Sequence, residues 1–127
     1  MSAARHHILD IYGVHLHLAT TQREWSTLRR KQTWLVKKPN ASGLACFATF
    51  HPKKPGPVVP HLALWVDVAL CADPLELVEI CSHEAAHGAA QILEWVGHEI
   101  KGSDEPSAYL VGWLTRWMHD GCTMAAE

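Results

Sequence analysis

Residues 73–97 read DPLELVEICSHEAAHGAAQILEWVG, and this stretch decides how the second half of the chain folds. Asp73 is a typical helix N-cap, Pro74 suits the first helical position, and Glu76 completes a capping box three residues after the cap. Gly97 is the residue type that most often ends a helix. The pattern therefore predicts one long helix that stops at Gly97.

Within this predicted helix lies a complete HExxH motif, His83-Glu84-Ala85-Ala86-His87. Residues four apart share one face of a helix, so His83 and His87 are placed to offer two imidazole nitrogens to one Zn²⁺. Glu84 lies one step round from His83, close to such a metal without binding it, where a carboxylate can take a proton from water. The motif predicts a zinc centre with Glu84 as general base.

An acidic turn and a second helix follow the motif. Residues 102–106 read GSDEP, and the pattern after them predicts a helix from Pro106 to about Met118 that ends before Asp120-Gly121. Antiparallel helices lie about 8–10 Å apart, so this turn brings the chain back towards the motif.

The turn supplies a candidate third metal ligand. Glu105 follows His87 by eighteen residues, which is enough chain for a helix end, a reversal and the start of the next helix. Asp104 and His98 are the alternatives for this position, and a capping role is the alternative for Glu105 itself.

The first half of the chain predicts strands and one helix. The expected elements are a strand over residues 8–19, a helix from about 21 to 36, a strand over 44–50, a proline-rich surface loop over 51–60 and a strand over 61–68. Together with the two later helices, this order predicts an α+β fold. We expect one domain over residues 1–127, with a small three-stranded sheet packed on helices and the metal between the last two.

Composition narrows the class of protein. Apolar residues make up 48% and charged residues 19% of the 127, which is typical of a globular domain. No apolar run is long enough to span a membrane, and nothing near Met1 resembles an export signal, so we expect a cytoplasmic protein. The four cysteines show no C-x-x-C spacing and are expected to be reduced thiols.

Charge is divided between the two halves of the chain. Residues 1–64 hold nine Lys and Arg against two Asp and Glu, whereas residues 65–127 hold two against eleven. Docking of the two halves on each other is the simpler explanation of this division. The small net charge of −2 argues against a nucleic-acid partner.

The motif region resembles a known group of enzymes. His83-Glu84-x-x-His87 followed by Glu105 on a second helix is similar to the gluzincin zinc metallopeptidases, and the short chain resembles their single-domain members, the minigluzincins. Residues 81–118 also resemble small, uncharacterised HExxH proteins encoded by phages and prophages. The resemblance covers roughly the last 60 residues, and before them it rests on element order alone. It implies a zincin-like fold, Zn²⁺ held by His83, His87 and Glu105, and Glu84 as the base.

The resemblance has two departures. Ala90 and Leu93 stand where the related metzincins need a glycine and a third histidine, and Glu105 precedes a proline, which biases it towards a capping position. Peptide hydrolysis also needs a donor that stabilises the developing oxyanion. Tyr109, one turn beyond Glu105, is the first candidate, and packing on a neighbouring tryptophan is its alternative role; His98 is the second candidate.

The remaining histidines and the tryptophans are assigned no site. His15 and His17 alternate on one strand and are expected to be surface residues. The other histidines without a partner at ligand spacing are His6, His7, His51, His61 and His119. Trp95, Trp113 and Trp117 follow helical spacings and are expected in the core or at a subunit interface.

Two functions from different classes are consistent with these residues. The first is a zinc-dependent peptidase, and the resemblance implies that it is phage-encoded. If the strand over 61–68 is the edge of the sheet, it pairs with an extended peptide substrate. The second is a catalytically inactive zinc-binding scaffold that resembles a peptidase and binds a host or phage protein.

Overall fold

The computed structural model describes residues 4–50, 56–101 and 104–126 and has the expected α+β fold. Its elements are β1 (Arg5–Leu9), β2 (Val14–Ala19), α1 (Gln22–Lys31), β3 (Gly43–Phe50), β4 (Val59–Val66), a single 3-10 turn η1 (Val68–Leu70), α2 (Pro74–Trp95) and α3 (Glu105–Ala126). Residues 51–55, which include His51 and half of the loop expected over 51–60, and residues 102–103 of the acidic turn lie outside the described residues, and the expected loop ends earlier than predicted because β4 begins at Val59.

The sheet has four strands in the order β1-β2-β4-β3, and the prediction of three strands was wrong. The segment expected as one strand, residues 8–19, reverses at Gly13, whose φ of 68° suits glycine. The Gly13 N–H donates to the Leu9 carbonyl at 2.8 Å and closes the turn between the antiparallel strands β1 and β2. The pattern missed this turn because apolar residues continue through it, among them Ile11, which is exposed.

Strand β4 lies inside the sheet. It pairs with β2 in parallel and with β3 antiparallel, so the hypothesis that residues 61–68 form an open edge is wrong. Its residues 62–66 are buried on both faces, as in a central strand. The edges of the sheet are β1 and β3.

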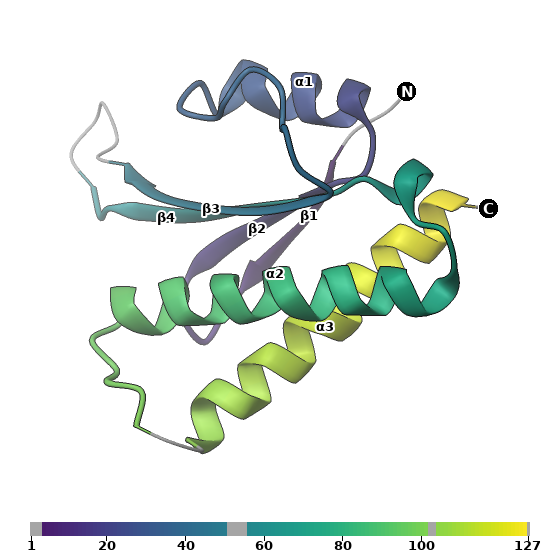
Figure 1. The fold of residues 1–127 in the computed structure, drawn as a ribbon. Helices are drawn as coiled ribbons and strands as arrows, with labels where there is room; N and C mark the ends of the chain where they lie inside the picture. Colours follow the sequence, from purple (N-terminus) through teal and green to yellow (C-terminus); the bar gives the residue numbers. More distant parts are fainter. Residues whose placement is uncertain (1–3, 51–55, 102–103, 127) are drawn as a thin grey trace.

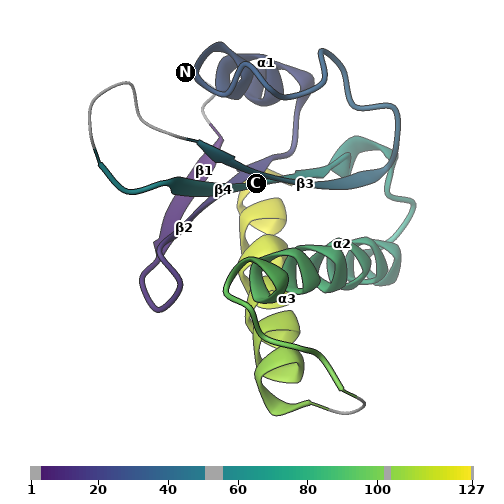
Figure 2. The same cartoon turned by 90° about the vertical axis from the view of Figure 1, so that its left-hand side faces the viewer.

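The sheet separates two layers of helices. Figures 1 and 2 show α1 on one face and α2 and α3 together on the other. The period of two along each strand divides the side chains accordingly. On β2, Leu16 and Leu18 belong to the core beneath α2 and α3, while Ala19 packs with Trp25 and Leu28 of α1.

Helix α1 begins at its predicted capping box and ends earlier than predicted. Thr21 Oγ1 accepts from the Glu24 N–H at 3.1 Å, as the motif requires. The helix ends at Lys31 rather than near Val36. The segment after Lys31 folds back on α1 instead of continuing it. The buried Trp25 of α1 donates through Nε1 to the Val36 carbonyl of this segment at 2.8 Å.

Helix α2 has the predicted bounds, whereas α3 is longer than predicted. Asp73 Oδ1 accepts from the Glu76 N–H at 2.8 Å, and Gly97 follows the helix with a φ of 78°. Helix α3 continues through Gly121 instead of ending before Asp120. At Gly121 a Cβ would lie 2.5 Å from Leu18 Cδ2, so this glycine allows close contact with the sheet, and packing overrides its low helix propensity.

The cysteines and tryptophans range from buried to exposed. None of the four cysteines forms a disulfide, and Cys81 and Cys122 are buried. Trp117 is buried in the core as expected, but Trp95 is 40% exposed. In the described part of the chain no helix has the length and apolar character needed to cross a membrane.

Candidate active site

His83 and His87 lie on the exposed side of α2 with their rings turned towards each other. Their Nε2 atoms are 3.2 Å apart and their ring centroids 4.8 Å apart. Two imidazoles bound to one tetrahedral Zn²⁺ at 2.0–2.1 Å have nitrogens about 3.3 Å apart. The helix therefore holds the two nitrogens at the separation of two ligands of one ion.

Glu84 points the other way, into the space between α2 and the edge strand β3. Its side chain is buried, with 8% of its surface exposed. A Cβ on Gly43 would lie 2.7 Å from Glu84 Cγ and 2.8 Å from Oε2, so only a residue without a side chain fits there. Gly43 thus makes room for the carboxylate at the first residue of β3.

A cavity of about 360 Å³ connects the base, one imidazole and the edge strand. Its lining residues are Ser42, Gly43, Glu79, Ile80, His83 and Glu84. His83 and Glu84 both line this cavity, whereas His87 is not among its lining residues.

The structure does not bring Glu105 to the histidine pair. Among residues 4–50, 56–101 and 104–126, no group of three or more His, Cys, Asp or Glu side chains is placed to hold a metal ion. Glu105 is exposed at the first turn of α3. The residue of α3 that lies against Gly88, beside His87, is Leu114. Leu114 is nine residues, or about 13 Å of helix, beyond Glu105.

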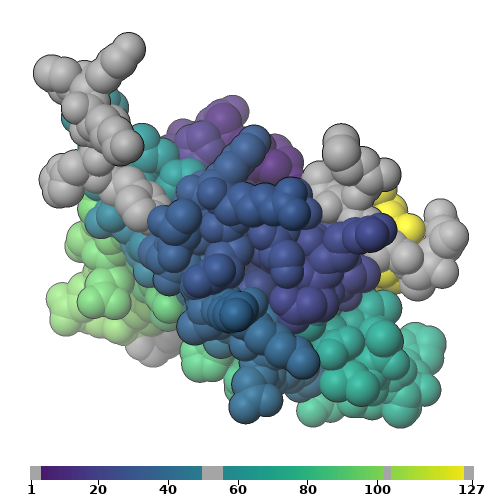
Figure 3. All heavy atoms as spheres, turned by 90° about the horizontal axis from the view of Figure 1, so that it is seen from above, coloured from purple at the N-terminus to yellow at the C-terminus, as the bar shows by residue number. Residues whose placement is uncertain are grey.

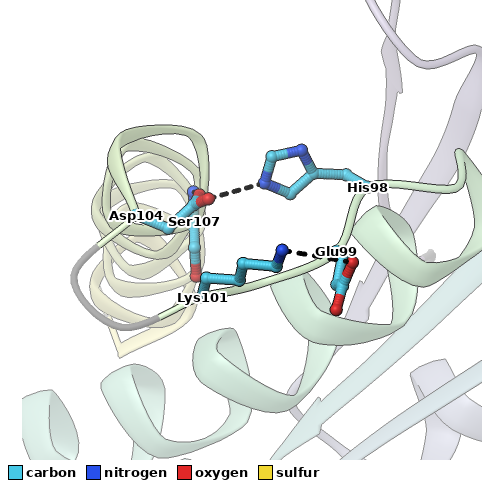
Figure 4. A network of polar contacts seen from close by, with 5 residues as sticks. All are labelled: His98, Glu99, Lys101, Asp104 and Ser107. Carbon is cyan, nitrogen blue, oxygen red and sulfur yellow. Dashed lines mark hydrogen bonds and ion pairs between the residues drawn. The ribbon is translucent and has the colours of Figure 1, made fainter.

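The two alternative ligands bind each other instead. His98 Nε2 lies 2.8 Å from Asp104 Oδ2, and Asp104 Oδ1 accepts from the Ser107 N–H at 2.9 Å (Figure 4). The bond from Ser107, followed by the contact with His98, lowers the pKa of Asp104. Asp104 therefore caps α3 and links its start to His98, which follows α2. Glu105 is the first helical residue after this cap.

Tyr109 stands apart from the cavity. It is 77% exposed on α3 and does not line the space next to His83 and Glu84. His98, the second candidate for an oxyanion donor, is engaged with Asp104. The structure thus places neither candidate donor at the motif.

Two features of the site escaped the sequence analysis. Glu79 lines the cavity one turn before His83, and the spacing of four residues was the available signal. Further along the same helix, a second cavity of about 430 Å³ is lined by Phe47, Gln91, Glu94 and Trp95. Gln91 Oε1 is buried there without a hydrogen-bond partner in the described residues. This second cavity could not be foreseen, because it depends on which strand packs against α2.

A second cluster of histidines lies on the opposite face of the sheet. It consists of His6, His15, His17 and His61. The expectation that His15 and His17 are surface residues was wrong for His17, which is 7% exposed, and His6 and His61 do have histidine neighbours. Burial, followed by the nearby histidines, lowers the pKa of His17 to about 3 and that of His61 to about 4.

Comparisons with models of known protein families, with curated proteins and with solved structures found no match to this chain.

Proposed function

We propose that this protein is a zinc-dependent peptidase whose catalytic centre lies on α2 at His83, Glu84 and His87. The observation that carries the proposal is the convergence of His83 and His87 Nε2, 3.2 Å apart, beside a cavity that also holds the Glu84 carboxylate. Two imidazoles at this separation suit Zn²⁺, which would supply Lewis-acid polarisation and lower the pKa of water towards neutrality.

Glu84 is the general base of the proposed reaction. Its carboxylate accepts a proton from the attacking water and returns it to the leaving amine. Contact with Gly43 and burial between α2 and β3 hold the side chain in one orientation. A base fixed in this way loses little conformational entropy when substrate binds.

The edge strand β3 is the proposed binding site for the peptide. Among the described strands it pairs with β4 alone, so its outer backbone groups are available to an extended peptide. The strand follows α2 in the same direction, with Gly43 beside Glu84 and Phe47 beside Trp95. The two cavities along this line, on either side of His87, provide room for substrate side chains.

Two carboxylates are candidates for a third metal ligand. The resemblance to gluzincins favours Glu105, which requires the start of α3 to move towards His87. Position on the helix favours Glu79, which already lines the cavity with His83. Measured zinc affinity for Glu79→Gln and Glu105→Gln distinguishes them, because loss of a true ligand weakens binding far more than loss of a nearby charge.

The deciding experiment compares Glu84→Gln with the parent protein on a peptide library. We expect the variant to keep its zinc and to lose cleavage, because the amide cannot accept the proton. Glu99→Gln is the matched control, since Glu99 is an exposed loop residue. If Glu84→Gln cleaves at the parent rate, the assignment of the base is wrong.

The alternative function is a peptidase-like scaffold that binds a partner protein without cleaving it. The positions of Tyr109 and His98 favour it, because neither candidate oxyanion donor lines the cavity beside Glu84. In that case an extended peptide still adds to β3, and Glu84→Gln leaves peptide affinity unchanged. Parent protein loaded with zinc that binds library peptides but releases no product would support the scaffold over the enzyme.

A further inference from the structure

Strand pairing gathers four histidines on the face of the sheet that α1 covers. His6 of β1 lies opposite His17 of β2, and His15 of β2 lies beside His61 of β4. His15 and His17 are two residues apart, so their side chains share this face. The opposite face of the sheet carries α2 and the HExxH motif (Figure 1).

The four imidazoles are in mutual contact. Ring centroids are 5.4 Å apart for His6 and His15, and 5.1 Å apart for His6 and His17. They are 5.0 Å apart for His15 and His61, and 5.2 Å apart for His17 and His61. The rings form a closed set of four, in which each has two neighbours within reach.

Nitrogen atoms face each other in two pairs. His17 Nε2 lies 3.0 Å from His61 Nδ1, and His6 Nε2 lies 3.2 Å from His15 Nδ1. Both separations are close to the roughly 3.3 Å between two imidazole ligands of one tetrahedral zinc ion. In each pair, the distance between the two nitrogens is therefore close to that between two of the four ligands of one metal ion.

The surroundings of the cluster also suit a bound cation. The four rings line a cavity of about 390 Å³ whose other walls are Ala4 and the α1 side, namely Thr27, Leu28, Lys31 and Gln32. Figure 3 shows α1 and the segment after it covering the middle of this face. Among the described residues no carboxylate lines the cavity, and four protonated imidazoles at these separations would repel one another. Neutral imidazoles are the form that binds metals.

We propose that His6, His15, His17 and His61 bind one divalent transition-metal ion of the class that prefers imidazole, such as Zn²⁺ or Ni²⁺. As placed, the nitrogens pair with each other and no three surround one point. The ion therefore reorients the rings about χ2, a broad torsion that costs little to turn. Lys31 is exposed, and its flexible stem lets the ammonium group move away from the ion.

A metal ion bound by these histidines would link three strands of the sheet. The ligands come from β1, β2 and β4, and β1 is an edge strand that, among the described strands, pairs with β2 alone. Because a metal that binds only the folded state stabilises it, occupancy of this site raises the unfolding temperature. The site is independent of the proposed peptidase centre, which lies across the sheet.

The test uses the full chain carrying His83→Ala and His87→Ala, so that the motif no longer binds metal. After removal of metal with a chelator, Zn²⁺ and Ni²⁺ are titrated separately by calorimetry. Bound metal is counted by elemental analysis, and the unfolding temperature is recorded with and without each ion. We expect about one equivalent bound and a higher unfolding temperature in the presence of metal.

Variants at the exposed end of the cluster then identify the ligands. His6→Asn and His15→Asn, singly and together, should weaken metal affinity roughly tenfold or more each and abolish the thermal shift. His7→Asn is the matched control, because His7 lies on the same strand but faces the tryptophans of α3. Neither His6 nor His15 is fully buried, so the metal-free variants should fold, and circular dichroism checks this.

Two results would overturn the proposal. The first is no metal bound by the protein that lacks His83 and His87. The second is metal binding by the His6 and His15 variants that equals that of His7→Asn. Since the parent for this test has no HExxH histidines, failure here leaves the proposed peptidase untouched, and failure of the peptidase leaves this site untouched.

Discussion

Gly43 and Glu84 lie so close together that a Cβ on Gly43 would stand 2.7 Å from Glu84 Cγ. Real Cβ atoms essentially never approach another carbon so closely, so a side chain at Gly43 forces Glu84 or β3 to move. This contact links the first residue of the edge strand to the proposed base. It makes the position of the carboxylate dependent on a residue 41 positions earlier in the chain.

Gly43→Ala should therefore displace the carboxylate and lower the proposed peptidase activity, while the proposed zinc binding by His83 and His87 should be unchanged. Overpacking of this kind costs about 1–3 kcal/mol of stability. Urea denaturation and zinc analysis measure the two effects. In Gly43→Ala combined with Glu84→Ala the two contacts with Glu84 are removed and only the contact with Ile80 Cγ2 at 2.9 Å remains, so the loss in stability should be less than the sum of the single losses. Strict additivity would show that the two residues do not interact.

Gly121→Ala should destabilise the protein, whereas Gly112→Ala on the same helix should not. A Cβ at Gly121 meets Leu18 Cδ2 at 2.5 Å, but at Gly112 it meets nothing within 4 Å. We expect a loss of about 1–3 kcal/mol for Gly121→Ala. Gly112→Ala should gain about 0.5–1 kcal/mol, because alanine favours the helix. Equal effects in thermal unfolding would contradict the packing of α3 on β2.

Acid should destabilise the metal-free protein through His17 and His61. Their folded-state pKa values of about 3 and about 4 lie below the ordinary 6.5, so the unfolded chain takes up protons first as the pH falls. Stability is then complete above about pH 6.5 and declines towards pH 4, by at most about 1.4 kcal/mol per pH unit for each group. His61 contributes less because solvent screens its more exposed ring.

Denaturant titrations in chelator at several pH values measure this dependence. His17→Asn should flatten the slope between pH 6.5 and 4, because asparagine does not titrate. The control is His119→Asn on α3, which is outside the cluster and should keep the parent slope. An unchanged slope in His17→Asn would show that other groups control acid unfolding.

Asp104→Ala should loosen the start of α3. The substitution removes the acceptor for the Ser107 N–H and the partner of His98 (Figure 4). Loss of an N-cap costs about 1 kcal/mol. Hydrogen exchange at Ser107 and Ala108 should accelerate more than exchange near Leu114. Asp120→Ala, on the same helix and exposed, is the control and should leave exchange at the helix start unchanged.

The ends of helices were predictable where short-range contacts decide them. The N-caps at Thr21 and Asp73 form as predicted, the glutamate three residues on accepts from the residue before each cap, and Gly97 follows α2. These signals act over three or four residues, so no knowledge of the rest of the fold is needed. The far end of α3 was not predictable, because Gly121 reads as a helix breaker until its contact with Leu18 is known.

In the candidate site, too, local spacing predicted some features and tertiary packing decided the others. A helical spacing of four residues was enough to bring His83 and His87 together. The neighbours of Glu84 were not predictable, since Gly43 reaches it through the packing of β3 on α2. The position of Glu105 also depended on tertiary structure: the crossing of α2 and α3 places Leu114 beside the motif instead.

The sequence by itself determined the helix that carries the motif and the face on which its two imidazoles meet, because both follow from the 3.6-residue period of one segment. Only the tertiary structure decided that four histidines from three strands form one cluster. His17 and His61 are 44 residues apart in the chain, and no local spacing relates them. Their contact exists because β2 and β4 pair in parallel, and the register of that pairing is set by burial of the whole sheet.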